Sequence, residues 1–137
     1  AARLMRAQGS GLICLTSSTA GQMGYPLRSP YASAKWAIVG LTKTLAMELG
    51  EAGVRVNAIC PGAVEGPRMD RVIENEASAR GQAVDAVRQS YVKGVSMKTW
   101  VTAQDIANTV RFLASPSGSK ISGQILAVDG HTETLAP

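Results

Sequence analysis

The chain has few of the residues that mark disulfide-stabilised, metal-binding or nucleic-acid-binding proteins. Its 137 residues include two cysteines, one histidine and 4% aromatic residues. Two cysteines are too few for a disulfide framework, and a single histidine without a second ligand at a suitable spacing argues against a metal site. The net charge of +4 comes from dispersed basic residues, so we expect no nucleic-acid binding.

Long apolar runs are also missing. No stretch of about 18 apolar residues occurs, and the first residues lack the apolar segment of a signal peptide. We therefore expect no membrane span, no secretion and a cytoplasmic location. Cys14 and Cys60 lie in apolar runs and are expected to be small buried side chains without chemistry. His131 is expected to lie at the surface.

The residues that are present indicate one α/β domain. Hydrophobic residues make up 45% of the chain and charged residues 18%, as in globular proteins. Short apolar runs at residues 12–15, 54–59 and 125–128 predict three strands. A cluster of hydroxyl side chains follows the first strand, and Pro61 and Gly62 follow the second. Open α/β sheets bind ligands at these carboxyl ends of their strands.

A long helix is predicted between the first two strands. From Ser29, with Pro30 in the first turn, apolar residues recur at spacings of three and four, and either Gly50 or Gly53 ends the pattern. The predicted apolar stripe consists of Ala34, Ile38, Leu41, Leu45 and Leu49.

Three more helices are predicted before the last strand. Residues 65–100 hold two short amphipathic patterns. The first consists of Met69, Val72, Ile73 and Ala77, and the second of Val84, Val87, Tyr91 and Val95. Thr102 and Asp105 then predict a capping box for a helix that stops before Pro116.

Ser18, Tyr31 and Lys35 form a candidate proton-transfer site. Tyr31 and Lys35 stand four residues apart, so on a helix both side chains lie on one face. A positive charge beside a phenol favours the phenolate and lowers the phenol pKa from about 10. The phenol then becomes a usable acid or base. Ser18 is a candidate donor to an oxygen that gains negative charge, as in an oxyanion hole.

The Tyr–Lys pair is a weak signal alone, because such short spacings arise by chance. Its context is more specific. LICLTSSTAG precedes the pair, VRVNAICPGAVEGP follows it, and ISGQILAVDG lies near the end of the chain. Together these segments resemble the short-chain dehydrogenase/reductase family, over residues 8–130. The pattern of this family consists, in order, of a strand, SSxxG, YxxxK on a helix, a strand with N-x-x-x-PG, and a last strand that ends in DG.

The resemblance implies a partial Rossmann-like doubly wound parallel sheet with its last three strands and their helices. It implies an oxidoreductase that transfers hydride between NAD or NADP and an alcohol or ketone, with Ser18, Tyr31 and Lys35 as catalytic residues. Tyr31 and Lys35 would also bind the cofactor, together with Pro61, Gly62 and Val64. Residues 65–100 would cover the substrate as a lid, with ordinary packing helices that do not contact the substrate as the alternative. The full-length protein would be a homo-dimer or homo-tetramer.

The chain also departs from the family pattern. It lacks the glycine-rich TGxxxGIG turn and the NNAG segment, so residues 1–137 are expected to be one partial domain, the C-terminal half of such an enzyme. Gly66 stands where the family usually has the threonine of PGxxxT. One hydrogen bond to the cofactor is then missing, for which Arg68 or Asp70 are candidate replacements.

Two functions therefore remain open at the level of sequence. The first is a nicotinamide-dependent oxidoreductase, of which the isolated 137-residue chain is expected to be inactive. The second is a truncated, non-catalytic oligomerisation or packing module. The identity of the substrate and the choice between NAD and NADP do not follow from these residues, because the adenosine ribose is recognised elsewhere in such folds.

Overall fold

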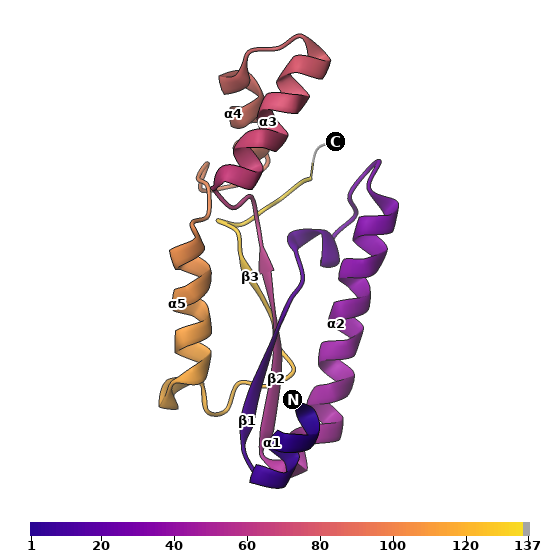
Figure 1. The fold of residues 1–137 in the computed structure, drawn as a ribbon, viewed down its shortest axis with the longest axis vertical. Coiled ribbons are helices and arrows are strands. Elements are labelled where there is room, and N and C mark those ends of the chain that lie inside the picture. The colour runs from indigo at the N-terminus through magenta and orange to yellow at the C-terminus, as the bar shows by residue number, and fades with distance from the viewer. Residues whose placement is uncertain (136–137) are drawn as a thin grey trace.

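The protein folds as alternating strands and helices around a three-stranded parallel sheet (Figure 1). A computed structural model describes residues 1–135. The strands are β1 (Gly11–Thr16), β2 (Val54–Pro61) and β3 (Ile125–Val128). The helices are α1 (Ala2–Gln8), α2 (Ser29–Leu49), α3 (Pro67–Arg80), α4 (Val84–Lys93) and α5 (Ala103–Ala114). The predicted α/β class, the three strands and the four longer helices are confirmed.

The sheet has the order β1-β2-β3, with both pairs parallel. Ile13 is paired with Val56, and Ile59 with Leu126. The central strand β2 is almost fully buried, whereas the apolar residues of β1 are all only half-buried. Among the described residues, β1 is thus an edge strand of the sheet.

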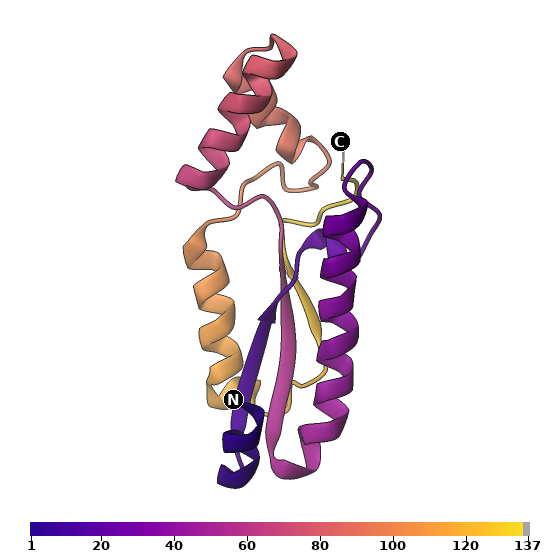
Figure 2. The same cartoon turned by 45° about the vertical axis from the view of Figure 1, so that its right-hand side comes forward.

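Helices cover both faces of the sheet. Helix α2 packs beside β2, where Leu49, Val54 and Val56 form a buried cluster. Helix α5 lies on the opposite side of the sheet from α2, as Figures 1 and 2 both show, and its Leu113 is fully buried. Burial of one face of each helix against the sheet is what a doubly wound architecture requires.

A buried asparagine fixes the approach to the last strand. Asn57 is fully buried in β2. Its side-chain amide donates to the carbonyl of Ile121 at 2.9 Å, and its side-chain oxygen accepts the N–H of Gln124 at 3.0 Å. A buried amide without partners would destabilise the fold, so these bonds set the position of the segment from which β3 starts.

The buried face of α2 differs from the predicted stripe. Ala34 and Leu41 are exposed, Leu41 to 49%. The face against the sheet keeps Leu49 of the predicted stripe and also includes Thr42, which is fully buried. The Thr42 hydroxyl donates to the Ile38 carbonyl at 2.7 Å. Because this bond satisfies the hydroxyl within the helix itself, a threonine can occupy a position that polarity alone assigns to the surface.

The glycines after α2 have separate roles. The chain continues beyond Gly50 into a short 3-10 helix over Gly50–Ala52. Gly53 then adopts the left-handed conformation, with φ of 71°. It is therefore Gly53 that ends the helical segment, as one of the two predicted positions.

Helices α3 and α4 form a pair beyond the carboxyl ends of the strands (Figure 2). The pair has a small core of its own, made by Ile73, Ala77 and Val87. Helix α4 ends at Lys93, earlier than the predicted pattern. Val95 lies in the following turn, where it is buried and paired with Thr132.

The segment after α4 is paired with the segment after β3. The N–H of Ser96 donates to the carbonyl of His131 at 2.8 Å, and the N–H of Met97 donates to that of Gly130 at 3.1 Å. Residues 94–97 and 130–133 thus run beside each other and connect the α3–α4 pair to the sheet.

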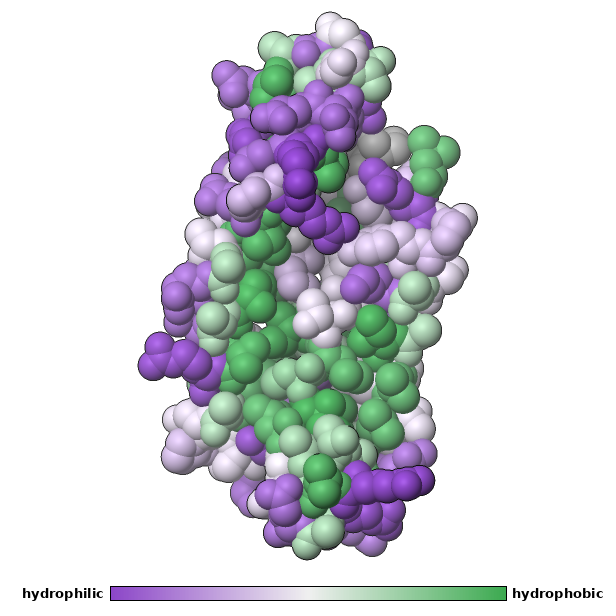
Figure 3. Space-filling view, in the orientation of Figure 1, coloured by the Kyte–Doolittle hydropathy of each residue, from purple (hydrophilic) through white to green (hydrophobic). Residues whose placement is uncertain are grey.

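Apolar side chains gather over the sheet end of the molecule. Figure 3 shows them around β1 and between α5 and α2, whereas the α3–α4 end is mostly hydrophilic. Several large apolar side chains are exposed, among them Trp36, Leu41, Met47 and Phe112. None of the helices in the described part is both long and apolar enough to cross a membrane.

Candidate active site

Two serines follow β1, and each has a different set of contacts. Ser17 is buried, and its hydroxyl donates to the Lys35 carbonyl at 2.8 Å. Ser18 is half-buried, and its hydroxyl accepts the N–H of Ala20 at 3.2 Å, which caps a short 3-10 helix over Thr19–Gly21. Since a hydroxyl has one donor and two acceptor positions, Ser18 retains its O–H for a ligand.

Tyr31 and Lys35 lie on one face of α2, as the spacing predicts. The Lys35 ammonium nitrogen is 5.6 Å from the centre of the Tyr31 ring. The same ammonium donates to the carbonyl of Thr16, the last residue of β1, at 3.3 Å. Tyr31 is 44% exposed. A phenol open to solvent and a cation anchored beside it can together exchange a proton with a bound ligand.

The end of β2 lies next to the two serines. The Ser17 N–H donates to the Ile59 carbonyl at 2.8 Å. The following residue, Cys60, is fully buried beside Ser17. Burial raises the pKa of the Cys60 thiol, and a hydrogen bond with Ser17 opposes that rise. Burial likewise raises the pKa of Cys14. Both thiols are thus protonated at neutral pH. Cys60 is buried, as expected, whereas Cys14 is only half-buried.

Pro61 and Gly62 form a tight junction with the end of β3. The Gly62 N–H donates to the Val128 carbonyl at 3.0 Å. A Cβ at Gly62 would come within 2.8 Å of the Cβ of Asp129, so no larger residue fits without displacement. The Asp129 carboxylate accepts the N–H groups of His131 and Thr132, each at 3.0 Å.

Val64 is paired with Val101 in an isolated parallel bridge. The Val101 N–H donates to the Ala63 carbonyl at 2.9 Å, and the backbone N–H of Glu65 donates to the Val101 carbonyl at 2.8 Å. In this pattern the flanking residues make the bonds. The N–H and C=O of Val64 itself therefore point away from Val101 and can meet a ligand.

Gly66 has a backbone conformation that would strain the threonine which the resemblance predicts at this position. Its φ is 148°, which only glycine adopts without strain. Of the two candidate replacements, Asp70 is engaged elsewhere, because its carboxylate accepts a hydrogen bond from Arg88. Arg68, in the first turn of α3, is exposed.

Sequence reasoning predicted Ser18, Tyr31 and Lys35 as site residues but gave no role to the residues that hold Lys35. Ser17 bonds the Lys35 backbone, and the Thr16 carbonyl accepts the Lys35 ammonium. The only signal for Ser17 is its place in the Ser-Ser pair. No sequence signal marks Thr16, because it acts through its backbone.

His131 is exposed, as predicted, and its Nδ1 lies 2.7 Å from the Ser96 hydroxyl. Among residues 1–135, no group of three or more potential ligand side chains could hold a metal ion.

A cavity of about 920 Å³ lies between the α3–α4 pair, the residues before α2 and the segment after β3. Its lining includes Tyr25 and Arg28, which precede Tyr31 in the chain, and Glu76, Tyr91 and Glu133. Tyr31 and Ser18 do not line it. The cavity therefore adjoins the candidate site along the chain without containing its reactive groups.

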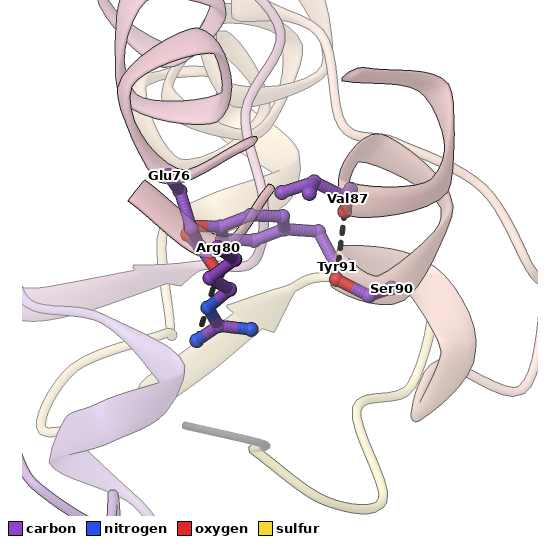
Figure 4. A network of polar contacts seen from close by, with 5 residues as sticks. All are labelled: Glu76, Arg80, Val87, Ser90 and Tyr91. Carbon is purple, nitrogen blue, oxygen red and sulfur yellow. Dashed lines mark hydrogen bonds and ion pairs between the residues drawn. The ribbon is translucent and has the colours of Figure 1, made fainter. Parts of the chain in front are cut away.

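A chain of polar contacts forms one wall of the cavity (Figure 4). The Tyr91 hydroxyl donates to Glu76 at 2.6 Å, and Arg80 forms an ion pair with Glu76 at 3.0 Å. Burial, followed by the hydrogen bond to Glu76, raises the pKa of Tyr91 well above its usual value. Tyr91 also contacts Trp100, with 5.9 Å between the ring centres.

Comparison with known proteins gives consistent matches over nearly the whole chain. The family described as enoyl-(acyl carrier protein) reductase matches residues 1–131. D-beta-hydroxybutyrate dehydrogenase of Rhizobium meliloti (strain 1021) is 36% identical over 127 residues, which cover 92% of this chain and 49% of that protein. The chain thus spans about half the length of the curated relatives it matches.

Solved structures show the same fold. The crystal structure of an NAD+-bound xylitol dehydrogenase is 33% identical with a TM-score of 0.84, and the match covers 94% of this chain and 52% of that one. The structure of an actinorhodin polyketide ketoreductase variant with NADPH is 32% identical with a TM-score of 0.84, and the match covers 92% and 48%.

Proposed function

The chain belongs to the short-chain dehydrogenase/reductase family, and we propose that it forms the catalytic half of an oxidoreductase that uses NAD or NADP. The reaction interconverts a hydroxyl and a carbonyl group of a small substrate. The observation that carries the proposal is the position of the Lys35 ammonium, which is bonded to the end of β1 and lies 5.6 Å from the centre of the Tyr31 ring.

The roles of the chain's own residues follow from their contacts. Ser18 donates its free O–H to the substrate oxygen and so stabilises negative charge there. Tyr31 gives a proton to that oxygen in reduction or takes one in oxidation. The positive charge of Lys35 stabilises the phenolate that Tyr31 becomes after giving its proton. Ser17 is a positioning residue, because it bonds the Lys35 carbonyl.

The nicotinamide group fits the ends of the strands beside these residues. The backbone N–H and C=O of Val64 point away from their neighbouring strand, which suits them to the carboxamide. Because Gly62 has no side chain, Asp129 can lie close to its backbone, and Pro61 fixes the turn. Tyr31 and Lys35 would lie against the ribose. When bound, nicotinamide supplies or accepts the hydride.

Further parts of the proposal rest on the family resemblance. Residues 65–100 form a lid that contributes to substrate choice, and the α3–α4 pair beyond the carboxyl ends of the strands supports this assignment. The substrate is a small alcohol or ketone. The full-length protein is a cytoplasmic homo-dimer or homo-tetramer.

A spectrophotometric assay of the full-length protein tests the proposal. A panel of secondary alcohols and ketones is incubated with NAD, NADP and their reduced forms, and the nicotinamide absorbance is followed. At least one pair should turn over, and Tyr31→Phe should lower kcat about 10²- to 10⁴-fold, because the ring stays but the proton is lost. Turnover by Tyr31→Phe at the wild-type rate would refute the assignment.

A non-catalytic packing module is the second candidate. It is favoured by the exposed apolar side chains of α2, since Met47 is 83% exposed and both Trp36 and Leu41 are 49% exposed. Such a module would associate through α2 and show no turnover with any cofactor in the same assay.

A further inference from the structure

Charged side chains of both signs line the described part of the cavity beside the candidate active site. Its lining includes three cations, Arg28, Arg80 and Lys93, and two carboxylates, Glu76 and Glu133. The cavity is therefore suited to an anion, provided that the carboxylates are occupied by other partners.

Both carboxylates are occupied. Glu76 forms an ion pair with Arg80 at 3.0 Å and accepts the Tyr91 hydroxyl at 2.6 Å. Glu133 accepts the hydroxyl of Ser96, and this bond lowers the pKa of the Glu133 carboxyl. Neither carboxylate lies within 4 Å of the Arg28 or Lys93 cations, since the ion pairs between residues 1 and 135 are Arg80 with Glu76 and Arg88 with Asp70.

Arg28 is the cation placed nearest to the reactive groups along the chain. It is the residue before α2, and its carbonyl accepts the N–H of Ala32 at 2.9 Å, so the first turn of the helix begins at Arg28. Tyr31 follows three residues later. The Arg28 guanidinium lies 5.8 Å from the centre of the Tyr25 ring, which also lines the cavity. Stacking of this kind restricts the guanidinium but leaves its N–H donors for a ligand.

We propose that Arg28 binds the carboxylate of a hydroxy-acid or oxo-acid substrate, whose hydroxyl or carbonyl oxygen reaches Tyr31. This inference rests on the proposed oxidoreductase function. A guanidinium pairs with a carboxylate through two parallel hydrogen bonds, which would fix the distance between the acid group and the reacting oxygen.

Kinetics of the full-length protein test the proposal. Oxo acids of increasing chain length are compared with their methyl esters, which keep the ketone but lose the charge. The wild type should prefer the acid, and Arg28→Gln should lose that preference by about 10- to 100-fold in kcat/KM, the effect of one charged hydrogen bond. Arg28→Lys should restore part of it. Arg71→Gln, an exposed arginine of α3, is the matched control and should keep the preference.

A second measurement does not depend on turnover. Isothermal titration of the full-length protein uses hexanoate, its methyl ester and hexyl phosphate, none of which can be reduced. Hexanoate should bind more tightly than the other two to the wild type, and Arg28→Gln should weaken hexanoate alone. If hexanoate binds in this selective way but no substrate turns over, the anion site is supported and the oxidoreductase function is refuted.

Several outcomes would overturn the inference. Equal binding of hexanoate and its ester would show that charge is not recognised. Tighter binding of hexyl phosphate would replace the carboxylate with a phosphate. An equal loss of kcat/KM for acids and esters in Arg28→Gln, without rescue by Arg28→Lys, would reduce Arg28 to a structural role at the start of α2.

Discussion

The ammonium nitrogen of Lys35 lies 5.6 Å from the centre of the Tyr31 ring. Its position does not depend on the helix alone, because the ammonium is bonded to the carbonyl of Thr16 and the Lys35 backbone accepts the Ser17 hydroxyl. Two hydrogen bonds from the end of β1 thus orient one residue of α2. The charge is held where a helix by itself would leave a long and flexible side chain.

Removal of that charge should be nearly as damaging as removal of the phenol. Lys35→Ala is expected to lower kcat in the full-length protein about 10²-fold or more, and Ser18→Ala about 10²-fold through loss of one donor to the substrate oxygen. Lys43→Ala is the control, because Lys43 is an exposed lysine two turns further along α2. Steady-state rates at saturating substrate measure the effects, and a loss in Lys43→Ala as large as that in Lys35→Ala would contradict the assignment.

Two glycine substitutions should have opposite effects on stability. Gly62→Ala places a Cβ within 2.9 Å of the Asp129 Cα. Because backbone cannot move aside cheaply, we expect a loss of about 1–3 kcal/mol in the free energy of unfolding. Gly40→Ala lies in the middle of α2 with no atom within 4 Å of the new Cβ. It should stabilise the protein by about 0.5–1 kcal/mol. Urea denaturation measures both, and equal effects would contradict the packing of Gly62.

The capping box of α5 should make stability depend on acid. Bonds from the backbone and side chain of Thr102 lower the pKa of Asp105. A carboxyl whose pKa is lower in the folded state stabilises that state above the unfolded pKa and loses the effect as pH falls through the folded value. The Tm should therefore decrease as the pH is lowered below about 4. The decrease should be less steep in Asp105→Asn. Asp85→Asn, in the first turn of α4, is the control, and an identical acid response in Asp105→Asn and wild type would refute the prediction.

The 137-residue segment expressed alone should not bind nicotinamide cofactors. Open α/β folds grip the pyrophosphate at a glycine-rich turn, which these residues lack. The half-buried edge of β1 and the exposed apolar side chains of α2 should also cause association. Calorimetric titration with NAD and NADP and light scattering are the measurements. A well-folded monomer with micromolar cofactor affinity would contradict this expectation.

Local patterns predicted the elements well, because each had a strong physical cause. The capping box at Thr102 has both of its reciprocal bonds, and the apolar runs became β1, β2 and β3. The buried face of α2 was assigned wrongly at Leu41, because a satisfied hydroxyl lets Thr42 take the buried position. Apolar periodicity cannot register a hydrogen bond inside the helix.

In the candidate site too, some groups could be predicted from the sequence and others could not. Side-chain chemistry and spacing pointed to Ser18, Tyr31 and Lys35, and their roles stay a prediction. The Thr16 carbonyl, in contrast, acts through an atom that every residue has. Arg28 carried no motif either. Its proposed role depends on the cavity that α3 and α4 complete far along the chain.

The backbone pairing of residues 94–97 with 130–133 has a consequence for synthesis on the ribosome. The hydrogen bonds between Ser96 and His131 can form only after His131, 35 residues later in the chain, has been synthesised. Helices α3 and α4 emerge first and can form their own small core beside the bridge between Val64 and Val101, but their bonds to residues 130–133 form only after the segment after β3 has left the exit tunnel. Until then a nascent chain carries the helical pair without these bonds, and this is the stage at which chaperones or proteases have the best access to it.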